Sequence, residues 1–420
     1  MTTTVAREPA SKPMPLADYL GSVLRRLPPL PTLDLDVTQA YGAVLAEDVT
    51  ASHDAPAFDL AAIDGYAARS EDLHTGVTPP RLSVIGDLTA ASWRPVRVTP
   101  GGCFSLAAGT RLPAAADVVI PTEWTDQGMA VVEVHQIPRR GHGIRRVGDD
   151  ARAGTPLATA GTYLTPALVA MLLAAGVARV AVRPVPRVAV IATGDELVDA
   201  GRSQPGQVVD VTSHALAAAA DDAGALAHRV GICDDDPDLL RALLEEAAAQ
   251  ADLIITSGGT GTGPGDMLRR VLSRPEGNRA GSVTFTDLAV YPCSVLGFGT
   301  VGVDEVPIVC LPGDPGAALI GFEVLARPAI QLLAGAEPVF RRSVRAHLLE
   351  TVRSPAGRRE FRPALTARRR GGGYTVQPLP GGPDALAGLA VGNGLIVLGE
   401  RVTSAPAGAT VDVLLLERGG

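Results

Sequence analysis

Lysine is almost absent from this chain of 420 residues. Lys12 is the only lysine, although lysine and arginine together number 37. It lies within residues 1–14, which we expect to form a flexible leader. Any mechanism that requires a lysine in the folded body is therefore excluded.

Cysteine is also scarce, and its spacing suggests neither a metal site nor a disulfide framework. None of the four cysteines stands in a C-x-x-C pair; they are Cys103, Cys233, Cys293 and Cys310. A zinc knuckle and a fold held together by disulfides are therefore not indicated.

Long apolar runs are missing as well. No such run reaches the roughly 18 residues typical of a membrane helix, and the N-terminal MTTTVAREPASKPMP has no apolar core of a secretion signal. We therefore expect a cytoplasmic protein without a membrane segment. The net charge of −8 and the pI of about 5.4 argue against sequence-independent binding of nucleic acid, which needs clustered cations.

The composition is that of a well-packed protein with several domains. Hydrophobic residues make up 46% of the chain and charged residues 20%, and 420 residues are too many for one ordinary core. We expect a helical linker domain (15–49 with 146–182), a β-rich domain (50–145), a doubly wound α/β domain (183–336) and a small β barrel (337–420).

The α/β expectation comes from strands that alternate with helices after Arg187. RVAVIATG, AHRVGICDD, DLIITSGG and VPIVCLPG are strand patterns, and helical patterns separate them. This alternation predicts a mostly parallel, doubly wound sheet whose ligands bind beyond the carboxyl ends of the strands. Glycine and aspartate gather at four of these ends, in TGDE (193–196), CDDD (233–236), SGGTGTGPGD (257–266) and LPGDPG (311–316).

Local patterns predict further details. Thr165 should cap a helix over 166–175, and Asp236 should cap the helix that starts at Pro237. In the β-rich domain, strand patterns occur at RLSVIGDL (81–88), RPVRVTPGG (94–102), ADVVIPTEW (116–124) and MAVVEVHQI (129–137).

The stretch DLIITSGGTGTGPGDM (252–267) admits two interpretations. Its glycines could expose backbone N–H groups to an anion at a helix N-terminus. They could equally form a tight strand-to-helix turn in a glycine-rich sequence. The spacing matches neither G-x-x-x-x-G-K-[ST] nor G-x-G-x-x-G, so the two common nucleotide motifs do not decide between them.

Seven motifs in order resemble the molybdopterin molybdenumtransferase family, which includes the C-terminal domain of gephyrin. They are PAFDLAAIDGYA (56–67), LPAAADVVIPTE (112–123), IRRVGDDARAG (144–154), VAVIATGDELV (188–198), SGGTGTGPGD (257–266), LPGDPGAAL (311–319) and GNGLIVLGE (392–400). The resemblance implies an L-shaped chain of four domains that forms a homodimer, with a doubly wound third domain and a β barrel as the fourth. It also implies a reaction in which adenylated molybdopterin and molybdate yield molybdenum cofactor and AMP, with Mg²⁺ and possible contacts to other cofactor-biosynthesis proteins.

The resemblance also implies site residues. Glu196, Asp235 and Asp266 match acidic positions tied to metal binding and catalysis, and Asp59 lies in a loop that reaches the active site from the partner subunit in the family. The substrate-binding positions are Asp64, Arg145, Thr193, Gly194, Asp195, Ser257, Gly258, Gly259, Pro312, Gly313, Asp314 and Arg358. Two alternatives stay open: Asp266 could be a helix cap, and Asp59 and Asp64 could form Asx-turns in a surface loop.

Several departures from the family pattern concern groups that bind anions. The two lysines of the family's K-P-G-K-P segment fall on Tyr291 and Val295. Four other family positions are also replaced, by Ala108, Thr212, Gly261 and Asp314, and Pro383 stands where we align a serine. The expected arginine of the last domain is present as Arg358 or Arg359. Three functions therefore compete: an active transferase, a diverged protein that binds a pterin or nucleotide, and an interaction scaffold.

Overall fold

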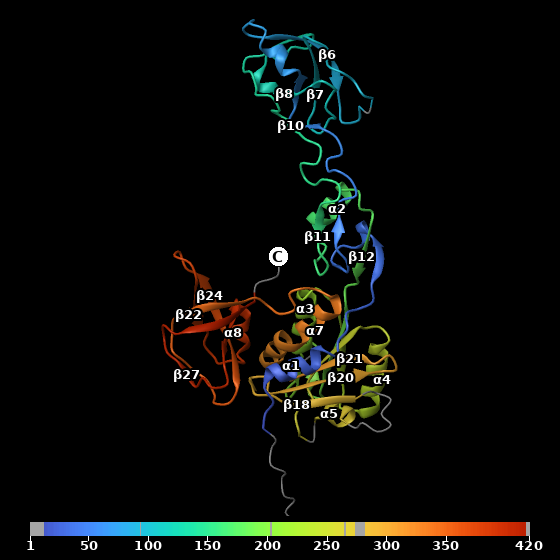
Figure 1. The fold of residues 1–420 in the computed structure, drawn as a ribbon. Helices are drawn as coiled ribbons and strands as arrows, with labels where there is room; N and C mark the ends of the chain where they lie inside the picture. The colour runs from blue at the N-terminus through green and yellow to red at the C-terminus, as the bar shows by residue number, and fades with distance from the viewer. Residues whose placement is uncertain (1–11, 93, 202–203, 264–265, 274–281, 417–420) are drawn as a thin grey trace, which may run out of the picture. The chain divides into compact units, whose positions relative to one another are not determined.

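The computed structural model describes residues 12–92, 94–201, 204–263, 266–273 and 282–416 (Figure 1). Most of the expected leader, residues 1–11, lies outside the described residues. The chain divides into two compact units. The first contains Met1–Thr32, Gly42–Val44 and Arg183–Gly420, and the second contains Leu33–Tyr41 and Leu45–Val182.

The first unit contains the sheet that the alternating pattern predicts. Its strands are β13 Arg187–Thr193, β16 Leu226–Cys233, β17 Leu253–Ser257, β18 Ser282–Asp287, β20 Val295–Val301 and β21 Val306–Leu311. They form one sheet in the order β16-β13-β17-β21-β20-β18. The first four strands in this order are parallel, and β20 is antiparallel to both of its neighbours, β21 and β18. The predicted doubly wound, mostly parallel sheet is therefore confirmed.

Helices cover both faces of this sheet (Figure 1). The helices that pack around the sheet are α1 Leu16–Leu24, α3 Thr212–Asp222, α4 Pro237–Ala248, α5 Met267–Leu272, α6 Pro315–Gly321 and α7 Arg327–Ala334. Alternate side chains of β13 enter two different cores. Val188 and Val190 pack in the core that contains α1, α3, α6 and α7, whereas Ala189 and Ile191 pack in the core that contains α4 and α5.

The two predicted helix caps are confirmed. Asp236 accepts hydrogen bonds from the amides of Asp238 (2.8 Å) and Leu239 (3.1 Å) at the start of α4. Thr165 accepts one from the amide of Leu168 (3.2 Å) at the start of α2, Pro166–Ala174, in the second unit. Each cap satisfies N–H groups that have no partner within the helix.

The longest helical run, Pro315–Ala334, belongs to the core of the first unit. Five residues of π-helix, Phe322–Ala326, join α6 to α7 just before Pro328, which has no amide to continue the hydrogen-bond ladder. The run is long and apolar enough to cross a membrane, but 78% of its most apolar window is buried within the fold. A core helix passes the same test, so this run is weak support for a membrane span.

A closed β barrel completes the first unit. Its elements are β19 Val290–Tyr291, β22 Ser343–Leu348, β23 Val352–Arg353, β24 Arg359–Arg368, β25 Tyr374–Pro378, α8 Leu386–Val391, β26 Gly394–Leu398, β27 Ser404–Ala405 and β28 Thr410–Leu415. The order β24-β25-β22-β28-β26 closes through a β24–β26 pairing, and β19 adds to β24. The barrel approaches α6 so closely that a Cβ on Gly316 would lie 1.9 Å from the carbonyl oxygen of Asp384.

The second unit is rich in short strands. Its main sheet has the order β8-β5-β7-β6-β9, formed by β5 Gly65–Ala68, β6 Arg81–Leu88, β7 Gly102–Leu106, β8 Val118–Pro121 and β9 Val131–Glu133. Shorter elements along this part of the chain are β1 Leu33–Asp36, η1 Val37–Gln39, β2 Val44–Leu45, β3 Val49–Thr50, β4 Leu60–Ala61, η2 Ser70–Leu73, η3 Thr122–Trp124, β10 Ile144–Arg145, β11 Pro156–Ala158 and β12 Arg179–Arg183.

One predicted strand of this unit is wrong. The segment RPVRVTPGG forms only a single bridge, between Arg97 and Ala114, before β7 begins at Gly102. Pro95 and Pro100 lack the amide that a ladder hydrogen bond requires, so the valines between them do not extend into a strand.

Candidate active site at the carboxyl edge of the parallel sheet

A pocket lies where the chain reverses direction across the sheet. After β13 the chain adds β16 on one side, and after β16 it crosses to add β17 on the other side. Such a switch point leaves a crevice beyond the strand ends. A cavity of about 560 Å³ lies there, lined by Thr193, Gly194, Glu196, Leu197, Val208, Val209, Asp210, Val211, Thr212, Asp235, Ser257, Gly258, Gly259, Thr260, Gly261, Asp266, Gly313 and Pro315.

The glycine-rich stretch forms one wall of this pocket, and its geometry explains its glycines. Gly258 and Gly259 have φ values of +93° and +63°, which side chains with a Cβ rarely adopt. A Cβ on Gly258 would also lie 2.6 Å from the carbonyl oxygen of Thr193. A Cβ on Gly261 would lie 2.8 Å from the carboxylate of Asp266. These glycines therefore allow the loop after β17 to pack closely against the end of β13 and against the carboxylate of Asp266.

Asp266 holds this loop in place. Its carboxylate accepts hydrogen bonds from the amides of Gly261 (2.8 Å) and Gly263 (2.5 Å). It precedes α5 but makes no side-chain cap to that helix, so the cap interpretation is wrong in this detail. The amides of Gly259 and Thr260 make no hydrogen bond within the described part of the chain. Both residues line the pocket, so their amides are donors in its wall without a partner among the described residues.

Acidic side chains form another part of the wall. The amide of Asp235 donates to the carboxylate of Asp195 (2.7 Å), which ties the loop after β16 to the loop after β13. Burial raises the pKa of Asp235, the negative charges of Asp195 and Glu196 raise it further, and Arg270 acts in the opposite direction. A bound cation would relieve this repulsion. Among the described residues, however, no three His, Cys, Asp or Glu side chains are grouped closely enough to hold a metal by themselves.

The start of α3 closes a further side of the pocket. Thr212 is buried, and its hydroxyl donates to the carbonyl oxygen of Gly313 (3.1 Å) in the loop after β21. The buried carboxylate of Asp210 accepts from the amide of Ser213 (3.0 Å) and from the guanidinium of Arg229 (3.0 Å). This network fixes α3 relative to the loops of the sheet.

The pocket also contains residues that sequence reasoning missed. Most of them are apolar and come from the segment between β13 and α3; they are Leu197, Val208, Val209, Asp210, Val211, Thr260 and Pro315. Leu197, Thr260 and Pro315 lie within motifs that carry the family resemblance. For Val208, Val209 and Val211 the sequence offers only the valines of the polar, glycine-containing segment GRSQPGQVVDVT, which matches no chemical motif.

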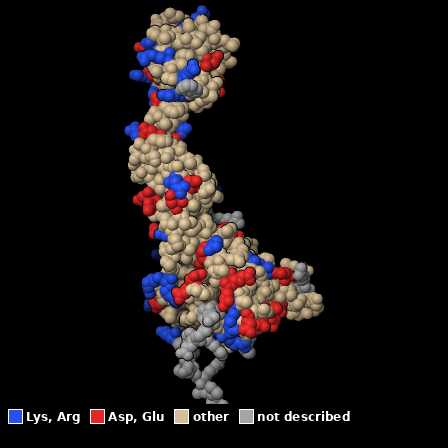
Figure 2. All heavy atoms as spheres, turned by 90° about the vertical axis from the view of Figure 1, so that its right-hand side faces the viewer, with Lys and Arg blue, Asp and Glu red and all other residues tan. Residues whose placement is uncertain are grey.

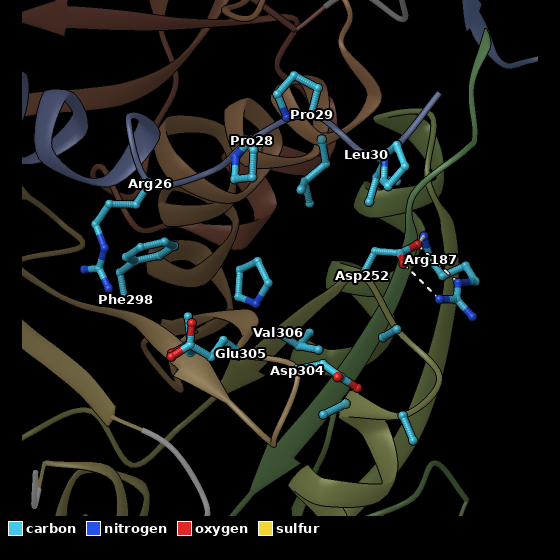
Figure 3. A pocket seen from close by; sticks show the side chains of 17 residues that line it. Arg26, Pro28, Pro29, Leu30, Arg187, Asp252, Phe298, Asp304, Glu305 and Val306 are labelled. Atoms are coloured by element: carbon cyan, nitrogen blue, oxygen red, sulfur yellow. Dashed lines mark hydrogen bonds and ion pairs between the residues drawn. The ribbon is translucent and has the colours of Figure 1, made fainter. Parts of the chain in front are cut away.

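A second cavity, of about 480 Å³, lies at the opposite edge of the same sheet (Figure 3). Its two arginines are engaged within the protein: Arg187 donates to both carboxylate oxygens of Asp252, and Arg26 lies over the ring of Phe298. None of the predicted site residues lines it. The chemistry of the chain therefore points to the pocket at the carboxyl edge.

Three family descriptions match successive parts of the chain. Residues 14–176 match the MoeA N-terminal region (domain I and II), residues 189–332 a probable molybdopterin binding domain, and residues 345–416 the MoeA C-terminal region (domain IV). The chain is also 38% identical over 407 residues to molybdopterin molybdenumtransferase 1 of Mycobacterium tuberculosis, which covers 91% of this chain and 94% of that protein. The chain belongs to the molybdopterin molybdenumtransferase family.

Other members of this family are similar over most of their length. The molybdopterin molybdenumtransferase of Bacillus subtilis is 30% identical over 383 residues, which is 89% of this chain and 87% of that protein. The structure of the molybdopterin biosynthesis moeA protein from Pyrococcus horikoshii OT3 has a TM-score of 0.70 at 26% identity, with 96% of this chain and all of that chain covered. The resemblance inferred from the seven motifs is confirmed, and the family is that of a transferase in molybdenum cofactor biosynthesis.

The predicted site residues of this molybdopterin molybdenumtransferase family member do not all line the pocket. Nine do: Thr193, Gly194, Glu196, Asp235, Ser257, Gly258, Gly259, Asp266 and Gly313. Asp195 bonds Asp235 from just outside, and Pro312 immediately precedes Gly313. Asp314 caps α6 by accepting from the amide of Ala317 (2.8 Å). That cap gives the aspartate a structural use that does not require a ligand.

Arg358 lies at the β19 side of the barrel. Its guanidinium donates to the carbonyl oxygens of Leu288 (2.8 Å) and Val290 (3.2 Å) and lies 3.5 Å from the carboxylate of Asp287. The arginine therefore braces the backbone next to Tyr291, one of the two positions where the family has lysine.

The remaining predicted residues lie in the second unit, and each has a partner there. Asp59 accepts from the guanidinium of Arg146 (2.6 Å) and from the amide of Val147 (2.9 Å). Asp64 accepts from the amide of Ala108 (2.7 Å). Arg145 forms an ion pair with Asp150. Neither Asp59 nor Asp64 accepts a hydrogen bond from the amide two residues ahead, so neither forms an Asx-turn.

Proposed function

We propose that the protein inserts molybdate into adenylated molybdopterin and releases AMP. The observation that carries this proposal is the pocket at the switch point. It combines free loop amides at Gly259 and Thr260 with the carboxylates of Glu196 and Asp235, in a chain of this family. Cleavage of a phosphoanhydride requires donors for phosphate oxygens and carboxylates that position a divalent cation.

Each group has a separate role in this proposal. The amides of Gly259 and Thr260 bind a phosphate oxygen, and Asp266 keeps the loop in the conformation that presents them. Glu196 and Asp235 fit Mg²⁺ as a pair, because this ion usually takes one or two protein carboxylates and completes its shell with phosphate and water. When bound, Mg²⁺ would neutralise charge on the phosphates. Thr212 holds the loop after β21 at the rim.

We also propose that the protein acts in the cytoplasm as a homodimer. All four cysteines are free and buried, which suits a reducing compartment. In the dimer, the loop that contains Asp59 and Asp64 would complete the site of the partner subunit, as the family resemblance implies. Other cofactor-biosynthesis proteins are further possible partners for this assembly.

Molybdate-dependent release of AMP from adenylated molybdopterin tests the reaction directly. The expected result is release that requires both molybdate and a divalent cation, and that falls when Glu196 or Asp235 is replaced. Complementation of a strain that lacks the transferase is the matching test in cells. Failure of both tests with a folded protein overturns the proposed reaction.

The second candidate is a diverged protein that binds a pterin or nucleotide with little turnover. Tyr291 and Val295 favour it, because two ammonium groups of the family pattern are absent and Lys12 is the only lysine. A thermal shift with AMP and Mg²⁺, without AMP release, would identify this function. If neither a thermal shift nor AMP release is observed, the interaction scaffold is the remaining function.

A further inference from the structure

Part of the pocket wall is apolar and exposed. Val208 and Val211 are 54% and 44% exposed, although both line the cavity. Leu197 lines it too, and it pairs in register with Val208 across the short parallel strands β14 Leu197–Val198 and β15 Val208–Val209. Partners in register share one face of a sheet, so Leu197 and Val208 stand side by side. We call Leu197, Val208 and Val211 the aliphatic wall.

The aliphatic wall is fixed by hydrogen bonds at both of its ends. The amide of Val208 donates to the carbonyl oxygen of Glu196 (2.8 Å), and the amide of Asp210 donates to that of Val198 (2.9 Å). Asp210 is itself held by Arg229 and is almost fully buried. The three side chains are therefore presented by a braced segment, which lowers the entropic cost of binding against them.

The aliphatic wall and the glycine-rich loop lie on opposite sides of the end of β13. Val211 precedes α3, which packs on one face of the sheet, and Asp266 precedes α5, which packs on the other. A ligand that spans the pocket thus meets aliphatic side chains at one end and the free amides of the glycine-rich loop at the other. This division suits a molecule with an apolar flat part and an anionic part.

We propose that the aliphatic wall is the subsite for the flat heteroaromatic ring of the substrate, purine or pterin. The inference rests on the proposed function and adds the residues that select the ring. Both faces of such a ring are poorly hydrated, so covering the exposed methyl groups of Val208 and Val211 removes apolar surface from water on both partners. The phosphates of the same ligand then reach the amides of Gly259 and Thr260.

Calorimetric titration of the full chain with three probes tests this subsite. The probes are AMP, ribose 5-phosphate, which lacks the ring, and 6-hydroxymethylpterin phosphate. The double variant Val208→Ala/Val211→Ala should weaken binding of the ring that uses the wall by about tenfold. Ribose 5-phosphate should bind equally to both proteins. Val303→Ala is the matched control, because Val303 is 98% exposed on the turn between β20 and β21.

The outcomes separate the possibilities. Loss of AMP affinity alone assigns the wall to the purine, and loss of pterin affinity alone assigns it to the pterin; either supports the proposal. Unchanged affinity for both rings overturns the proposal and leaves the transferase function intact. Equal loss of ribose 5-phosphate affinity also overturns it, since the damage would then be general. A shift from dimer to monomer with ring binding unchanged would make the wall a subunit contact. Wild-type protein that binds none of the probes overturns both the subsite and the function.

Discussion

Restoring a lysine at Tyr291 tests what the missing cations cost. Tyr291 pairs in register with Glu360 on the parallel strands β19 and β24, so their side chains share one face. Glu360 is fully buried; one carboxylate oxygen accepts from Arg362 (2.6 Å), and the other has no hydrogen-bond partner among the residues that the structure describes. We expect the ammonium group of a lysine at 291 to reach that oxygen, because the two residues are neighbours in register.

The expected gain in stability follows from this geometry. A hydrogen bond between charged groups contributes about 1.5–3 kcal/mol, and a buried acceptor without a partner is costly. Tyr291→Lys should therefore exceed the uncharged control Tyr291→Met by about 1.5–3 kcal/mol in free energy of unfolding. The difference should disappear when both are combined with Glu360→Gln, and denaturant titration of the four proteins gives this coupling as a double-mutant cycle.

The same lysine should affect the reaction less than its charge suggests, because Glu360 competes for it. A lost donor to developing charge costs on the order of 10²–10³ in rate. We expect weak molybdate-dependent AMP release by the natural chain and a partial recovery, by about tenfold or more, in Tyr291→Lys/Val295→Lys. A natural chain as active as an intact relative and unimproved by the two lysines, or a Tyr291→Lys no more stable than Tyr291→Met, would refute this reasoning.

Three further predictions concern the pocket and the assembly. Asp266→Asn and Glu196→Ala should each weaken Mg²⁺-dependent AMP binding, measured by calorimetry, by about tenfold or more. Both variants should still unfold cooperatively on heating. If Asp266→Asn loses its cooperative melt, the two hydrogen bonds from its loop amides are essential to the fold. Asp235→Asn should raise the free energy of unfolding at pH 7 without metal, by no more than about 1 kcal/mol for a solvent-screened group. The sign follows from the raised pKa of Asp235: above the ordinary pKa of an aspartate, its charged form is disfavoured in the folded state. The stability advantage of Asp235→Asn over the wild type should therefore grow from pH 4 to pH 7, and an advantage that does not grow would contradict this reasoning. Light scattering at micromolar concentration should give the mass of a dimer, and a monomer mass would rule out the proposed shared site.

The doubly wound sheet was predictable because its signals are local. Apolar runs such as RVAVIATG mark buried strands, and Thr165 and Asp236 mark helix starts through a side chain that bonds an amide two or three residues on. The exception, RPVRVTPGG, fails for an equally local reason: Pro95 and Pro100 remove the donors on either side of its valines.

The site was predictable from the sequence only where acidic residues directly follow a predicted strand. The carboxylates of Glu196, Asp235 and Asp266 follow strands, and a switch point gathers such residues at one crevice. The hydrogen-bond partners of each of these residues could not be predicted from the sequence. Asp266 takes loop amides instead of capping α5, and Asp314 caps α6, because hydrogen bonds depend on backbone angles that sequence spacing does not fix.

The glycines of the β17 loop show how both interpretations of one motif can hold. Gly258 and Gly261 are required by packing, since a Cβ at either position meets atoms of Thr193 or Asp266. In the same turn, the amides of Gly259 and Thr260 have no hydrogen-bond partner among the described residues. In the proposed function the tight turn therefore provides the phosphate-binding donors, because amides without an acceptor in the protein stay available to a phosphate. A substitution such as Gly258→Ala should accordingly damage phosphate binding through the shape of the turn, and the loss should appear with ribose 5-phosphate as strongly as with AMP.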